Sequence, residues 1–119
     1  MKKKREIGFE YEEIAKSFLI SEGLSYVESN FYSRYGEIDL IFSEGNGKVL
    51  VFIEVKYRKN SNYGEVLEMV DKEKQKRIRT VSQIFMNKVN WKKDVRFDVI
   101  GISRDKSGNN IINWIKNAF

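Results

Sequence analysis

Two runs of β-forming residues, joined by a turn sequence, constrain the fold of this chain more than any other feature. The runs Gly36–Phe42 and Val49–Lys56 flank the dipeptide Asn46-Gly47, which is typical of a two-residue type I′ hairpin turn. Such a turn, bordered by Gly45 and Lys48, would fix the register of the hairpin. We therefore predict one β-hairpin here, with side chains alternating between its two faces.

This register predicts that two carboxylates lie opposite each other. It places three cross-strand pairs on one face: Ile41 with Phe52, Asp39 with Glu54, and Glu37 with Lys56. Like charges directly opposite each other destabilise a sheet, and the surrounding residues are apolar enough for burial on both faces. A divalent cation between Asp39 and Glu54 would offset the repulsion. The alternative is a solvated sheet face carrying ordinary cross-strand charge pairs.

The composition limits the chemistry that such a site could perform. The chain has 119 residues, which predicts one domain spanning residues 1–119. It contains no Cys and no His. Disulfides, thiolate zinc sites, Cys/His or Ser/His nucleophile pairs and a His general base are thereby excluded. Any catalysis must use carboxylates, Lys, Tyr, hydroxyl groups or a metal ion.

The charge pattern bears on partners and location. The net charge is +5, and a basic surplus favours polyanionic partners, although this signal is weak by itself. The basic start Lys2–Arg5 is followed by Glu6 and Glu10 rather than by the apolar segment of a signal peptide. The sequence also has no long uncharged apolar run that could span a bilayer. We expect a cytoplasmic protein that has no membrane association.

The hydrophobic period changes several times along the chain, which is typical of a mixed α/β (α+β) domain. Besides the hairpin, we predict a helix over 5–22, a strand over 26–31, a polar loop over 60–64, a helix over 70–89 with Asp71 as N-cap, a strand over 95–102, a turn over 105–110, and a strand or short helix over 111–119. The order is α-β-β-β-α-β with a tail.

Each predicted helix offers charged residues near its apolar face. On the first helix, Glu12 and Glu10 lie at opposite borders of that face, and periodicity does not choose between them. On the second helix, Lys74 falls on the apolar stripe one turn before Ile78. Lys74 either extends from the end of the core into water or points toward an anionic ligand.

Other charged and aromatic residues have simpler interpretations. For most of the basic residues in 72–79, a solvated helix face is the better interpretation. Asp98, in an apolar strand, is predicted to be structural and to pair with Arg96 or a neighbour. Trp91 and Trp114 are predicted to lie in the core, because neither belongs to an interleaved basic and aromatic run.

Asp39 followed by Glu54-Val55-Lys56 resembles the PD-(D/E)XK motif of the restriction-endonuclease-like superfamily. A closer resemblance, to the YraN-like family of small predicted nucleases, covers nearly the whole chain. It rests on Gly8, Glu12-x-x-Ala15, Asn30-x-x-x-Arg34-x-Gly36-Glu37-Ile38-Asp39-Leu40-Ile41, Val51-Phe52-Ile53-Glu54-Val55-Lys56-x-Arg58, Gly64, Val70, Lys74, Arg96-Phe97-Asp98-Val99-Ile100 and Asn117-Ala118-Phe119. Two positions depart from the pattern: Ile38 replaces the usual Pro, and Trp114 stands where a His is frequent.

The resemblance implies a restriction-endonuclease-like α-β-β-β-α-β core with a mixed central sheet flanked by helices. It also implies a metal-dependent phosphodiester hydrolase, similar to archaeal Holliday-junction resolvases. Asp39 and Glu54 would bind Mg²⁺ or Mn²⁺ together with the Val55 carbonyl. Glu12 would be a further ligand, directly or through water. The alternative for Glu12 is an ordinary helix glutamate that is favoured by the helix dipole. Lys56 would orient the attacking water.

The implied substrate is DNA, with branched or junction structures as candidates and a role in repair or recombination. Arg34, Arg58 and Lys74 would contact phosphates, although Arg34 and Arg58 could equally form salt bridges at the rim. A homodimer is a subsidiary expectation, because cutting both strands of a junction requires two sites. The alternative function is a nucleic-acid-binding module that keeps the fold but has little turnover.

Overall fold

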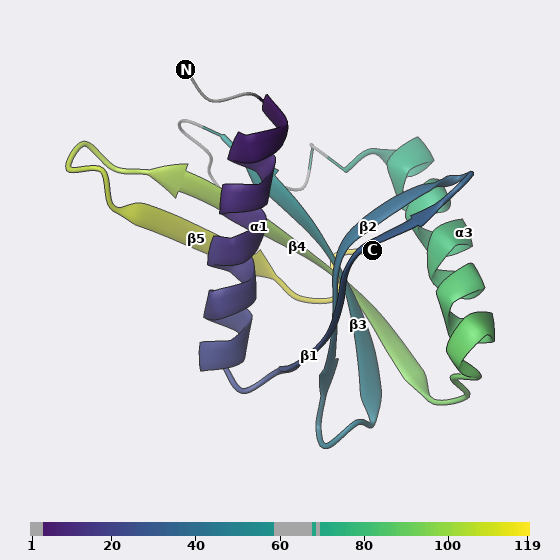
Figure 1. Cartoon of the computed structure of the whole chain (residues 1–119). Coiled ribbons are helices and arrows are strands. Elements are labelled where there is room, and N and C mark those ends of the chain that lie inside the picture. Colours follow the sequence, from purple (N-terminus) through teal and green to yellow (C-terminus); the bar gives the residue numbers. More distant parts are fainter. Residues whose placement is uncertain (1–3, 59–67, 69) are drawn as a thin grey trace.

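One mixed β-sheet, covered by a helix on each face, forms the framework of the protein (Figure 1). The computed structural model describes residues 4–58, 68 and 70–119. The elements are α1 (Lys4–Ser21), β1 (Ser25–Ser33), β2 (Gly36–Glu44), β3 (Val49–Tyr57), α3 (Lys72–Val89), β4 (Asp94–Arg104) and β5 (Asn110–Ile115). The predicted fold class and element order are confirmed, and the final segment forms a strand. The predicted loop over 60–64 lies outside the described residues.

The strands lie in the sheet in the order of the sequence. Neighbouring strands are antiparallel except β3 and β4, which are parallel and connected through the segment that contains α3. A parallel pair requires such a crossover connection, whereas the antiparallel pairs are joined by short turns. The predicted meander of three strands is therefore followed by one β-α-β unit.

Two apolar layers hold the helices against the sheet. On one face, Ala15 and Leu19 of α1 pack with Leu40 and Ile53. On the opposite face, α3 packs its own apolar stripe against the sheet: Ile78, Val81 and Phe85 pack with Ile41, Phe52 and Phe97. Each fully buried side chain of this size contributes roughly 1.5–3 kcal/mol of transfer free energy. Because neighbouring residues of β2 and β3 face opposite layers, both faces of the central strands are buried, as their continuous apolar runs predict.

The ends of the helices are fixed by local hydrogen bonds. At the end of α1, the Gly23 N–H donates to the Ile20 carbonyl at 3.0 Å and Gly23 has φ +94°, which suits glycine. At the start of α3, the Asp71 side chain accepts from the Lys74 N–H at 2.9 Å, which confirms the predicted N-cap. These caps set the positions at which each helix presents its charged residues.

The turn between β2 and β3 differs from the predicted two-residue turn. The loop Gly45–Lys48 joins the strands, and Gly45, Asn46 and Gly47 have φ of 67°, 59° and 79°. The Lys48 N–H donates to the Glu44 carbonyl at 3.2 Å. The predicted turn type was therefore wrong. The register was right, because Ile41 pairs with Phe52 as expected.

A buried polar network connects β4 to the end of the chain. The Asp98 carboxylate is fully buried and accepts from Arg96 Nε, Arg96 Nη2, Trp114 Nε1 and the Asn117 N–H, each at 2.9 Å. This confirms a structural role for Asp98, because a buried charge needs such partners. Trp91 and Trp114 pack against the apolar layers, as predicted. Within the part of the chain that the structure describes, no helix combines the length and apolarity needed to cross a bilayer.

Candidate functional site

The strands β2 and β3 separate at Asp39. Regular pairing between them continues as far as Leu40 and Ile53, one residue before the predicted pair of Asp39 and Glu54. Beyond that point the Val55 N–H donates to Asp39 Oδ2 at 2.8 Å. A carboxylate thus takes the place of a backbone acceptor, and the sheet opens into a fork.

The Asp39 carboxyl group lies half-buried in this fork, next to Glu54. Burial raises the pKa of Asp39 well above its usual range, and the charge of Glu54 raises it further. The hydrogen bond from the Val55 N–H opposes this rise in pKa, while the charge of Glu12 adds to it. The ionised form of Asp39 is therefore poorly stabilised by the protein alone.

Glu12 is the helix residue that reaches the fork, which settles the choice that periodicity left open between Glu12 and Glu10. Its half-buried carboxylate lines a cleft together with Asp39. Burial raises the pKa of Glu12, the hydrogen bond from Asn30 opposes that rise, and the charges of Glu37 and Glu54 add to it. Glu12 therefore belongs to the same crowded group of carboxylates.

Asn30 is a site residue to which the sequence analysis assigned no role. Its Nδ2 donates to Glu12 Oε1 at 2.7 Å and to Glu37 Oε1 at 2.9 Å. The Asn30 backbone has φ +52°, a left-handed conformation that Asn adopts more readily than most residues. An Asn inside a predicted strand was the available signal, since it marks an irregularity of the backbone.

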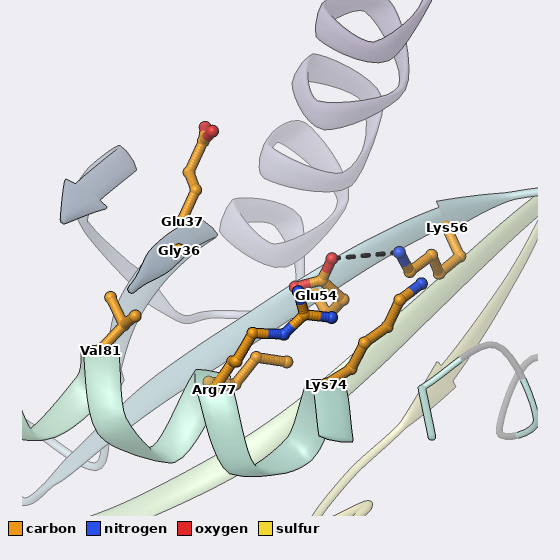
Figure 2. Close-up of a pocket in the computed structure, with 8 residues that line it drawn as sticks. Gly36, Glu37, Glu54, Lys56, Lys74, Arg77 and Val81 are labelled. Carbon is orange, nitrogen blue, oxygen red and sulfur yellow. Dashed lines mark ion pairs between the residues drawn. The ribbon is translucent and has the colours of Figure 1, made fainter. Parts of the chain in front are cut away.

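A second cleft opens on the α3 side of the fork (Figure 2). Lys56 Nζ lies 3.3 Å from Glu54 Oε1, and both side chains are largely buried. The amino group of Lys74 points toward that of Lys56 in Figure 2. The charge of Lys56 lowers the pKa of Lys74, and burial lowers it further. Lys74 therefore points into the site rather than away from the core into water.

Arg77 also lines this second cleft, although a solvated helix face was the favoured interpretation for most basic residues in 72–79. Its spacing from Lys74 on α3 was the signal, because residues three apart share a face of a helix. Three positive side chains from β3 and α3 thus lie around Glu54.

The structure corrects part of the predicted arrangement. The three cross-strand pairs were expected on one face of the hairpin. Asp39 instead lines the cleft on the α1 side, together with Glu12 of the helix, whereas Glu54 and Lys56 line the cleft on the α3 side. Glu37 lines both clefts. It accepts from Asn30 instead of pairing with Lys56. The reason is that regular pairing of β2 and β3 ends at Leu40 and Ile53, so the alternation of faces across the hairpin does not extend to Asp39 and Glu54.

The two predicted phosphate-binding arginines lie apart from these clefts. Arg34 is in the turn between β1 and β2, with its guanidinium 4.8 Å from the centre of the Tyr35 ring. Arg58 is exposed directly after β3, and its N–H donates to the Ile102 carbonyl at 3.0 Å. Of the predicted phosphate contacts, the structure brings only Lys74 to the fork.

The donor set at the fork fits a small hard cation that is bound partly by water. Among residues 4–58, 68 and 70–119, no three acidic side chains converge closely enough to hold a metal ion. Mg²⁺ is usually bound by one or two carboxylates, with waters and substrate phosphates completing its shell. Asp39 and Glu54 supply two such carboxylates, and Glu12 lines the cleft together with Asp39. The Val55 carbonyl faces the same opening, because the N–H and C=O of a strand residue point to the same side.

Comparison with known proteins shows to which family the chain is similar. The profile described as "Uncharacterised protein family UPF0102" matches residues 11–102. The chain is 43% identical over 118 residues to the UPF0102 proteins of Vibrio campbellii and Vibrio vulnificus, covering 97% of this chain and 93% of theirs. It is 39% identical over 121 residues to the UPF0102 protein of Alcanivorax borkumensis, covering 100% of this chain and 95% of that one.

Among solved structures, the chain is similar to that of Pyrococcus furiosus SfsA in complex with Ca²⁺. The two are 13% identical, with a TM-score of 0.37, and the similarity covers 94% of this chain and 63% of the other. A likeness this remote carries no argument about function.

Proposed function

The chain belongs to the uncharacterised protein family UPF0102, which confirms the YraN-like assignment, and from its site we propose a metal-dependent phosphodiester hydrolase that acts on DNA. The names of these relatives give no activity, so the proposed function depends on the site itself. One observation carries it: the Asp39 and Glu54 carboxyl groups crowd together at the fork, directly beside the crowded amino groups of Lys56 and Lys74.

These two charge pairs are complementary to a cation and a phosphate. Burial and the charge of Glu54 raise the pKa of Asp39, and the charge of Lys56 and burial lower the pKa of Lys74. A divalent cation would relieve the first repulsion, and a phosphate anion would relieve the second. A phosphodiester with Mg²⁺ or Mn²⁺ brings both charges to one point, which is why it fits this site better than either ion alone.

Each residue then has a definite role. Asp39 and Glu54 would hold the cation, with the Val55 carbonyl beside them and Glu12 connected directly or through water. A divalent cation supplies the stabilisation of growing phosphoryl charge that hydrolysis requires. Lys56, held by Glu54, would orient the attacking water, and Lys74 would bind the phosphate.

The substrate that we propose is branched DNA, including junctions, cut with selectivity for structure during repair or recombination in the cytoplasm. A homodimer would supply one site for each of two strands. Both points extend the family resemblance and depend on the phosphodiesterase proposal.

The proposal is tested by cleavage assays with junction, flap, single-stranded and linear duplex DNA, in Mg²⁺, Mn²⁺ or chelator. Glu54→Gln should abolish metal-dependent cleavage. Glu22→Gln, an equivalent change at an exposed position directly after α1, should leave it intact. Binding without cleavage of any substrate, unaffected by Asp39→Asn, would instead identify a nucleic-acid-binding module.

A further inference from the structure

We infer that a basic groove along α3 binds a single-stranded segment of nucleic acid next to the carboxylates. The α3 groove is defined by Lys74, Lys76, Arg77 and Thr80 of α3 and by Tyr35 of the β1–β2 turn. This inference rests on the proposed function, because it names the path by which one strand of the substrate leaves the fork. The groove binds an unpaired strand rather than a duplex.

The three hollows of the groove are adjacent, because each shares lining residues with the next. The cleft that contains Glu54 and Lys56 has a volume of about 180 Å³ and is also lined by Arg77. Arg77 lines the next hollow as well, together with Tyr35, Lys76 and Thr80. These last three residues line the hollow beyond it. A chain of three hollows thus leads from the fork along one side of α3.

The length and charge of the groove suit a sugar-phosphate backbone. It extends along α3 from Lys74 to Gln83, which is roughly 14 Å at the rise of an α-helix. Lys76 and Arg77 are exposed. Among the described residues that line the two outer hollows, Glu73 is the one carboxylate. A strand of a few nucleotides would place its phosphates against this row of cations.

Tyr35 makes the groove more suitable for an unpaired strand than for a duplex. Its side chain is 45% exposed at the wall of the groove. The Arg34 guanidinium lies over the ring at 4.8 Å and donates a hydrogen bond to the Tyr35 hydroxyl. A ring held in this way offers a surface on which a splayed base can stack, whereas the bases of a duplex are already stacked on each other. Arg34 thereby acts as a positioning residue for Tyr35.

Binding in chelator tests the groove without requiring cleavage. Fluorescence anisotropy with a labelled oligothymidylate and with a short duplex would compare the wild-type chain with the double variant Lys76→Ala, Arg77→Ala. The matched control is Lys48→Ala, Lys106→Ala, which removes the same charge from two exposed loop positions. Thermal unfolding of each variant shows that it is folded.

We expect the double variant to bind the single strand at least 10-fold more weakly, while the control binds within 2-fold of wild type. The slope of log K against log salt should decrease in magnitude by about 1.4 for two lost phosphate contacts on a single strand. Tyr35→Ala should weaken single-strand binding roughly 5- to 100-fold and leave duplex binding unchanged, whereas Tyr35→Phe should retain most of the affinity.

The outcomes separate this inference from the proposed function. If the double variant Lys76→Ala, Arg77→Ala binds the single strand like wild type, the α3 groove is not the binding site. This conclusion holds even where metal-dependent cleavage persists. If duplex is bound as tightly as single strand and Tyr35→Ala weakens both equally, the assignment to an unpaired strand is wrong. Suppose that binding depends on the groove residues but no substrate is cleaved. That result would support single-strand binding in the α3 groove and would contradict the proposed phosphodiester hydrolase.

Discussion

The backbone N–H of Val55 is hydrogen-bonded to Oδ2 of Asp39, across the point where β2 and β3 stop pairing. This bond fixes one oxygen of Asp39 while the carboxyl group stays close to Glu54. The hairpin thereby keeps a buried backbone donor satisfied and still opens a fork for a ligand. A local break in sheet pairing is thus what creates the site.

Asp39→Asn should stabilise the metal-free protein at neutral pH. The amide oxygen can still accept from the Val55 N–H, while the repulsion with Glu54 disappears. Because the pKa of Asp39 is raised in the folded state, the wild type loses stability as the pH rises through that pKa. We expect Tm in chelator to rise by a few degrees at pH 7, since about 1 kcal/mol corresponds to roughly 4–8 °C.

At a pH below the ordinary carboxyl pKa, the Asp39→Asn variant and the wild type should have nearly equal Tm, because Asp39 is then protonated in both the folded and the unfolded chain. A lower Tm for the variant at pH 7 would show that Asp39 and Glu54 do not repel each other.

Metal binding should release protons from Asp39 and Glu12, and the number of protons released should increase as the pH falls. The pKa values of Asp39 and Glu12 are both raised, chiefly by burial, so protons compete with the cation at a higher pH than for ordinary carboxylates. We expect Mn²⁺ affinity to fall between pH 8 and pH 5. Titration calorimetry in buffers of different ionisation heat would count the protons. Affinity that stays constant over this range would contradict the crowded arrangement.

Lys56→Ala should remove most of the cleavage while affecting DNA affinity little. The Lys56 amine is paired with Glu54 beside the carboxylates, where it can act on the attacking water. We expect the cleavage rate to fall roughly 10²- to 10⁴-fold, as for loss of a positioned proton-transfer group. Single-turnover rates and binding in chelator would be measured together. An equal loss of affinity would make Lys56 a phosphate anchor instead.

Asn30→Gly should weaken metal binding without disturbing the backbone. Gly tolerates the left-handed conformation at this position, so the substitution removes only the side chain that donates to Glu12 and Glu37. Without that donor the pKa of Glu12 should rise further. We expect a several-fold loss of Mn²⁺ affinity at pH 6 and a smaller loss at pH 8.

The control for Asn30→Gly is Asn46→Gly, which makes the same exchange at a left-handed position in the loop between β2 and β3. It should leave metal affinity unchanged at both pH values. An identical loss at pH 6 and pH 8 for Asn30→Gly would point to a role unrelated to the titration of Glu12.

Local patterns in the sequence were sufficient for the elements and for the register of the hairpin. Alternation of apolar residues and the Asn46-Gly47 dipeptide predicted that Asp39 lies near Glu54. The prediction of the register was right even though the turn itself is larger than predicted. The N-cap at Asp71 was predictable for the same reason, because its hydrogen bond joins residues in one turn of chain.

Tertiary packing alone decided how the charged side chains meet. Periodicity could not choose Glu12 over Glu10, because both border the same apolar face and only the position of α1 on the sheet separates them. The same is true of Lys74 and Arg77, which reach Glu54 only after α3 packs on the opposite face. The sequence by itself determined which residues share a strand or a helix. The packing of α1 and α3 on the sheet determined which of their charged side chains face one another, because contacts between distant segments leave no local pattern in the sequence.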